Sequence, residues 1–123
     1  MPSDQFHRIE KLVGNCEDWH EVGESGEPAF ENSWVNYGSG FESAGFYKDP
    51  FGRVHLKGMV DNGTDNATVF TLPEGYRPAL RELFVTQIST GSSRIDVTTA
   101  GVVSTLSAGA HTWLTLSGIS FRV

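Results

Sequence analysis

Short runs of alternating hydrophobic and polar residues dominate the chain from residue 44 onward. Residues 53–57 alternate strictly, which places Val54 and Leu56 on one face of a strand, and we expect residues 58–60 to extend that strand. Residues 82–88 alternate in the same way. Residues that favour turns separate these runs roughly every ten residues. We therefore predict about eight short strands after residue 44, at 45–48, 53–60, 68–72, 82–88, 94–98, 102–106, 112–116 and 119–123, preceded by one at 34–37.

This pattern of strands and turns predicts an all-β fold, an antiparallel β-sandwich that is jelly-roll-like. Strands do not alternate with helices along the chain, which argues against a doubly wound α/β fold. The turn at residues 49–52 has a clear cause, because Pro50 fixes φ and Gly52 accepts a positive φ. Polar loops are expected at residues 61–66 and 89–93.

Helical spacing occurs only near the N-terminus. Phe6, Ile9 and Leu12 recur at helical intervals after Asp4, which is a suitable N-cap residue. A helix this short is marginal in isolation, because nucleation is costly and few hydrogen bonds follow it. We therefore expect a short helical or extended arm that docks on another surface.

Length and segment character predict one folded domain preceded by that arm. A chain of 123 residues is the size of a single domain. We predict an N-terminal attachment arm at residues 1–16 and a β-sandwich head at residues 17–123. Residues 17–31 are polar and lack any period, so they are expected to form a loop.

The charge of the chain is concentrated in its first part. The whole chain has 9 basic and 15 acidic residues, a net charge of −6. Residues 1–47 contain two bases and nine acids, and the remainder is close to neutral. This balance argues against a nucleic-acid partner, because phosphate contacts require a surplus of Lys and Arg. The acidic segment is either a solvated segment or a surface that faces a basic partner or a neighbouring subunit.

Two further classes of protein are excluded by the hydrophobic residues. No stretch approaches the ~20 consecutive apolar residues of a membrane span, so membrane insertion is not expected. Residues 1–12 contain no apolar run typical of a secretory signal.

Residue types that carry chemistry form no recognisable motif. His20 with Asp18 or Glu21 is a possible metal contact, but a solvated charged loop is the simpler interpretation. His55 is expected to be exposed on its strand. Cys16 has no second cysteine to pair with, and we expect it to be a small buried hydrophobic residue, although the sequence leaves a spatial Cys–His pairing open. We predict no catalytic residue, no metal, no cofactor and no enzymatic activity.

Aromatic residues are plentiful for a domain of this size. The chain has 3 Trp, 3 Tyr and 8 Phe, which is ample material for one small core. Residues in the segment 34–46 are also candidates for a subunit interface, where Trp and Tyr are enriched. An aromatic ring that faces solvent could stack on a sugar ring.

Four stretches, taken in order, carry a resemblance to a known family. They are residues 30–37 (FENSWVNY), 44–60 (AGFYKDPFGRVHLKGMV), 70–78 (FTLPEGYRP) and 113–121 (WLTLSGISF). Together they resemble the terminal head domain of tailed-bacteriophage fibre, spike and minor tail proteins, over roughly residues 19–122.

The resemblance implies a β-sandwich head that assembles as a homotrimer on the surface of a virion and is made in the host cytoplasm. Such heads bind receptors on the host surface, often saccharides, and as a rule are not enzymes. Candidate receptor-facing positions lie in the two polar loops: Asn62, Asp65, Asn66, Ser92 and Ser93. The residues shared with the family look architectural, and they are Trp34, Pro73, Gly75, Tyr76, Pro78, Trp113 and Gly118.

Two other functions are weighed against receptor binding. Relatives usually carry the head after a long shaft, whereas a short arm precedes it here. The alternative is therefore a capsid or tail decoration protein, held on other virion proteins through Phe6, Ile9 and Leu12 and lacking receptor binding. A small glycan hydrolase is a third hypothesis, and no motif supports it.

Overall fold

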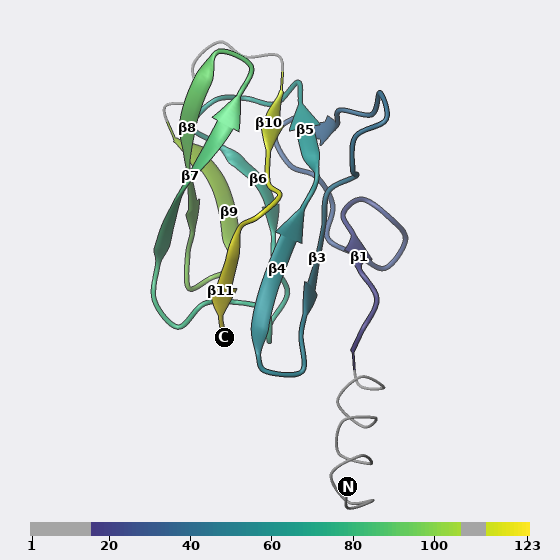
Figure 1. The fold of residues 1–123 in the computed structure, drawn as a ribbon, viewed down its shortest axis with the longest axis vertical. Helices are drawn as coiled ribbons and strands as arrows, with labels where there is room; N and C mark the ends of the chain where they lie inside the picture. The colour runs from purple at the N-terminus through teal and green to yellow at the C-terminus, as the bar shows by residue number, and fades with distance from the viewer. Residues whose placement is uncertain (1–15, 107–112) are drawn as a thin grey trace, which may run out of the picture.

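The computed structural model describes residues 16–106 and 113–123, and in this part of the chain it contains strands and no helix. Two antiparallel sheets pack against each other (Figure 1), which confirms the prediction of an all-β antiparallel sandwich. The predicted arm, with Phe6, Ile9 and Leu12, lies outside the described residues, so the division into arm and head stays a prediction. The described residues contain no helix long and apolar enough to cross a membrane.

The smaller sheet has four strands in the order β1-β3-β4-β11. Its strands are β1 (His20–Glu21), β3 (Gly45–Lys48), β4 (Arg53–Lys57) and β11 (Ser120–Arg122). The larger sheet has seven strands in the order β2-β5-β10-β7-β8-β9-β6. Its strands are β2 (Val35–Asn36), β5 (Met59–Asp61), β6 (Thr68–Thr71), β7 (Glu82–Ile88), β8 (Gly91–Val97), β9 (Val102–Leu106) and β10 (Leu114–Thr115).

The core lies between the two sheets and follows the alternation of each strand. Val54 and Leu56 point inward from β4, as their spacing predicts, and are buried. Phe46 on β3 stacks on Phe70 on β6, with ring centroids 6.0 Å apart. Hydrophobic burial of this kind is the main favourable term in folding, and one continuous cluster of buried side chains joins the two sheets.

The predicted extension of the strand at residues 53–57 through residues 58–60 is wrong, because the chain changes sheets at Gly58. β4 belongs to the four-stranded sheet and β5 to the seven-stranded sheet. Gly58 has a φ of +111°, and a Cβ atom there would lie 2.4 Å from the Ala44 Cα atom. A side chain therefore does not fit at this crossing, and only glycine adopts the backbone conformation without strain.

Other expectations also differ from the structure. His55 is half-buried on β4 rather than exposed. Residues 17–31 contain β1, because His20 and Glu21 pair with Phe46 and Gly45 on β3. Ser92 and Ser93 belong to β8 and not to a loop, since their backbone pairs with β7. The thiol-bearing residue Cys16 is exposed rather than buried, because it precedes the first strand.

The residues predicted to be architectural occupy varied positions. Trp34 is fully buried, and its ring fills the space that a Cβ atom at Gly63 would need. Pro78 is buried, and Tyr76 packs against the core. Pro73 and Trp113 are partly buried, while Gly75 and Gly118 are exposed with positive φ angles. Their shared role in holding the fold stays a prediction.

Candidate functional site

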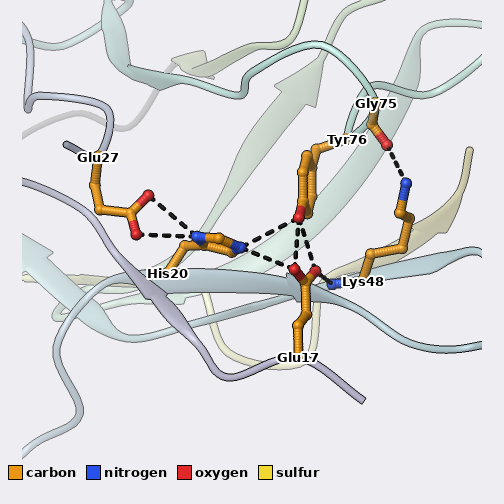
Figure 2. A network of polar contacts seen from close by, with 6 residues as sticks. All are labelled: Glu17, His20, Glu27, Lys48, Gly75 and Tyr76. Carbon is orange, nitrogen blue, oxygen red and sulfur yellow. Dashed lines mark hydrogen bonds and ion pairs between the residues drawn. The ribbon is translucent and has the colours of Figure 1, made fainter. Parts of the chain in front are cut away.

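Two polar clusters lie on the four-stranded sheet, and the first surrounds His20 on the edge strand β1. The Nδ1 atom of His20 lies 2.9 Å from a carboxylate oxygen of Glu27, and its Nε2 atom lies 2.9 Å from one of Glu17 (Figure 2). The imidazole ring stacks on Phe46, with centroids 5.0 Å apart. An imidazolium ring donates from both nitrogens, so this arrangement suits the protonated form.

Glu17 is the centre of the same cluster. Its carboxylate accepts a hydrogen bond from the Tyr76 hydroxyl at 2.6 Å and another from the backbone N–H of Lys48 at 2.6 Å. The Lys48 Nζ atom donates in turn to the backbone oxygen of Gly75 at 2.8 Å (Figure 2). The cluster therefore joins the acidic segment before β1 to β3 and to the irregular segment that contains Tyr76. We call Glu17, His20, Glu27 and Tyr76 the histidine network.

The neighbours of three groups in the network shift the pKa of each. Partial burial lowers the pKa of His20, but hydrogen bonds to Glu17 and Glu27 and their negative charges outweigh burial, so the net effect raises it. Partial burial raises the pKa of Glu17, but hydrogen bonds from Tyr76, His20 and the Lys48 backbone outweigh it, so the net effect lowers it. Burial and the Glu17 carboxylate raise the pKa of Tyr76 to about 12.

The geometry of the network does not favour a metal ion at His20. The carboxylates of Glu17 and Glu27 lie at opposite ring nitrogens, so they do not converge on one point. Glu21, the alternative metal contact weighed from the sequence, forms an ion pair with Lys57 at 2.8 Å. Within residues 16–106 and 113–123 no group of three His, Cys, Asp or Glu side chains is arranged to hold a metal ion.

The second cluster lies at the β3–β4 turn, where Asp49, Phe51, Arg53 and Arg122 line an open groove of about 390 Å³. Arg53 on β4 and Arg122 on β11 are direct cross-strand partners. The turn brings the ring of Phe51 to the surface, where 72 % of the residue is exposed. Figure 1 shows this turn and the end of β11 at one end of the sandwich, with the β7–β8 turn at the other. We call these four residues the arginine groove.

Asp49 organises the turn that carries the groove. One of its carboxylate oxygens accepts hydrogen bonds from the backbone N–H groups of Phe51 and Arg53, both at 3.0 Å. The other lies 2.9 Å from the Nε2 atom of His55, whose ring stacks on Tyr47. Hydrogen bonding to His55 and to the Arg53 backbone lowers the pKa of Asp49. The Asp-Pro-Phe-Gly sequence thus forms a turn whose acid is occupied by the turn itself.

The predicted receptor-facing residues occupy different surroundings. Asn62, Asp65 and Asn66 are exposed in the segment between β5 and β6. Ser92 is exposed on β8, whereas Ser93 is buried and its hydroxyl donates to the backbone oxygen of Leu106 at 3.3 Å. Buried as it is, Ser93 presents little surface to a partner.

The arginine groove was not predicted from the sequence. The turn was recognisable from Pro50 and Gly52, but the approach of Arg122 to Arg53 depends on the pairing of β4 with β11. The available signal was the pair Phe121-Arg122 at the end of the chain, which alternates between apolar and charged as Val54 and Arg53 do.

An apolar surface is exposed on the outer face of β7. Leu83 and Val85 are 55 % and 84 % exposed. They are cross-strand partners of Asp96 and Arg94 on β8. Asp96 is fully buried and forms ion pairs with Arg81 and Arg94, so the groups of this ion-pair network near the two apolar side chains are two bases and one acid.

Comparisons with known proteins bear on the fold. No protein-family model matches the chain, and no curated protein matches its sequence. Among solved structures, the chain is similar to the receptor binding protein (gp15) of Listeria phage PSA, with a TM-score of 0.67 and 19 % sequence identity. The match covers 97 % of this chain and 74 % of that one. It shows that the two proteins share a fold.

Proposed function

We propose that this protein is a bacteriophage virion surface protein whose head contacts the host cell. The observation that carries the proposal is the shared fold, which extends over 97 % of the chain and links it to a phage receptor binding protein. The family resemblance of residues 30–37, 44–60, 70–78 and 113–121 supports the same conclusion from the sequence. Fold alone does not determine function, so the proposal requires a direct test.

The proposed activity is binding, without chemical turnover. The two described histidines are held by carboxylates, His20 by Glu17 and Glu27 and His55 by Asp49. The Tyr76 hydroxyl, 3.2 Å from His20, donates its hydrogen bond to Glu17. The protein would be made in the host cytoplasm and assembled into particles there. A host-surface glycan is the proposed partner, because solvent-facing aromatic and polar side chains suit sugar rings.

Purified phage particles whose genome encodes this chain provide the test of location. Particles purified on a density gradient are analysed by mass spectrometry. They are also immunogold-labelled with an antibody against the head and viewed by electron microscopy. We expect mass spectrometry to find the chain in the particles and the gold label to lie at a tail tip or fibre end. We also expect the purified head, carrying a fluorescent label, to bind host cells. Absence from purified particles would overturn the proposal, and capsid label without cell binding would favour the decoration protein instead.

We also propose that the head is a homotrimer. The exposed Leu83 and Val85 support this, because solvent-facing apolar patches often mark protein contacts, and closed symmetry is the norm for oligomers. Light scattering should give three times the 13.4 kDa chain mass. Val85→Glu should yield monomers, whereas Asn62→Asp, which adds the same charge on another element, should not. A monomeric wild-type protein at micromolar concentration would contradict the trimer.

A further inference from the structure

The arginine groove places two positive charges side by side with no acid committed to them. Arg53 and Arg122 face each other across β4 and β11. Like charges directly opposite each other destabilise a sheet. Within residues 16–106 and 113–123, no carboxylate oxygen lies within ion-pair distance of either guanidinium group. The pair therefore has a cost in the folded state that no ion pair in this part of the chain offsets.

Hydrogen-bond donors in the groove remain available. The Nε atom of Arg53 donates to the Ser120 hydroxyl at 3.0 Å, and one terminal nitrogen lies 3.4 Å from the Ser120 backbone oxygen. These contacts orient the guanidinium group and leave the rest of its five N–H donors unused. The side chain of Arg122 has no hydrogen bond or ion pair to any described residue.

Asp49 lies in the groove but is occupied by other groups. Its two oxygens are taken by the backbone of the turn and by His55. The groove thus contains two positive charges against one negative charge, and the negative charge is directed into the turn. An incoming anion would meet an excess of positive charge and oriented N–H donors.

Phe51 adds an apolar surface to this charged site. It is 72 % exposed at the tip of the turn, and its ring stacks on no other ring in the described part of the chain. An exposed aromatic ring offers an apolar face that a ligand can cover. A ring-shaped ligand with an apolar face could cover Phe51 while its charged group reaches the arginines.

We propose that the arginine groove binds an anionic saccharide, a sugar that carries a phosphate or carboxylate group. Arg53 and Arg122 hold the charged group through paired N–H donors, which suit both oxyanions. Phe51 contacts the apolar face of the sugar ring. That this saccharide belongs to the host surface rests on the proposed function, whereas binding at the groove does not. The groove lies at the β3–β4 turn, away from the predicted receptor-facing loop at Asn62, Asp65 and Asn66.

The test is a titration of the full chain, labelled with ¹⁵N, with glucose 1-phosphate, glucuronate, neutral glucose and inorganic phosphate at matched ionic strength. We expect saturable shifts of the Phe51, Arg53 and Arg122 amides with at least one charged sugar, and at least about tenfold weaker binding of glucose. The two charged sugars distinguish a phosphate from a carboxylate. If inorganic phosphate binds as tightly as the charged sugar, the ring contact is wrong. If neither charged sugar produces saturable shifts at the groove, the proposal is overturned.

Single substitutions show which side chains of the groove contribute to the affinity for the charged sugar. Arg122→Gln should weaken binding of the charged sugar by about tenfold or more, because a charge-assisted contact is lost. Phe51→Ala should weaken it by roughly threefold to tenfold. Arg77→Gln removes the same charge outside the groove and should leave the affinity unchanged. Equal effects of Arg122→Gln and Arg77→Gln would overturn the proposal by showing that only net charge matters.

The two proposals fail separately. A head that labels particles and binds cells but no charged sugar would disprove the groove proposal and keep the proposed function. A head that binds a charged sugar at the groove but is absent from particles would do the reverse.

Discussion

The two polar clusters on the four-stranded sheet differ in how completely the protein satisfies them. The histidine network lies at the β1 edge, where Glu17 and Glu27 occupy both ring nitrogens of His20. The arginine groove lies at the β11 edge, where two guanidinium groups share no acid among the described residues. Polar groups that satisfy one another hold the chain in place, and those left with unused donors at the surface are available to a ligand.

The largest effect on this contrast should come from His20→Ala. The change removes a ring that stacks on Phe46 and leaves the carboxylates of Glu17 and Glu27 without their shared partner. We expect the free energy of unfolding to fall by about 2 kcal/mol, less than for a fully buried charge because the network is partly exposed. Urea unfolding measures this. A fall of a few tenths of a kcal/mol would mean that the network does not hold the acidic segment before β1 in place.

Tyr76→Phe tests the same network more narrowly. The variant keeps the ring but loses the hydroxyl that donates to Glu17 at 2.6 Å. We expect a loss of about 1.5 kcal/mol, the lower end of the range for a hydrogen bond to a charged group, because the network is partly exposed. Tyr47→Phe is the matched control, because the Tyr47 hydroxyl makes no hydrogen bond to a described residue. Equal losses in the two variants would contradict a specific role for Tyr76.

The stability of the network should depend on pH in a defined window. The raised pKa of His20 means that its contribution is fully present below the unfolded value of 6.5 and is lost as pH rises through the folded value. The lowered pKa of Glu17 means that its contribution is present above the unfolded value of 4.5 and is lost as pH falls through the folded value. The network should therefore stabilise most between these two values.

Urea unfolding of the wild type and His20→Gln from about pH 4 to pH 9 checks this window. We expect the wild type to lose stability above pH 6.5 and the variant to lose less over the same range. His55→Gln serves as a control on the other histidine of the same sheet. Parallel curves for the wild type and His20→Gln would show that His20 does not supply the dependence.

The smallest effect should come from the groove. Arg122→Gln removes one of two like charges and breaks no hydrogen bond within the described residues. We expect the free energy of unfolding to stay within about 0.5 kcal/mol of the wild type, the usual range for exposed substitutions. A loss as large as that of Tyr76→Phe would show that Arg122 stabilises the fold, and the contrast between the two clusters would then be wrong.

Local patterns in the sequence were sufficient to predict most of the fold. Residues 82–88 form β7 with the predicted alternation. The alternation of buried and exposed side chains along a strand depends only on residues adjacent in the sequence. β1 was missed because two residues in a polar segment gain their pairing from β3, more than twenty positions away. The crossing at Gly58 was missed because the period of two continues through it, and only the approach of Ala44 reveals the change of sheet.

The candidate sites were less predictable, because both depend on contacts between distant segments. Glu17 and Tyr76 are 59 positions apart, and Ser120 supports Arg53 from 67 positions away. Cys16 was expected to be buried on the basis of residue type, but its place before β1 leaves it exposed. Residue type and spacing predict which face a side chain takes, whereas the register between strands decides which charges meet.

The most direct test of the contrast measures ligand-induced thermal stabilisation of the wild type, Tyr76→Phe and Arg122→Gln with the charged sugar that binds. A ligand at ten times its Kd adds about 1.4 kcal/mol to the stability of a protein that binds it. We predict that Tyr76→Phe starts from a lower melting temperature yet shows the full wild-type ligand shift. Arg122→Gln should start at the wild-type temperature and show little shift. If Arg122→Gln keeps the full shift, or Tyr76→Phe loses it, the division between a network that holds the fold and a groove that binds a ligand is contradicted.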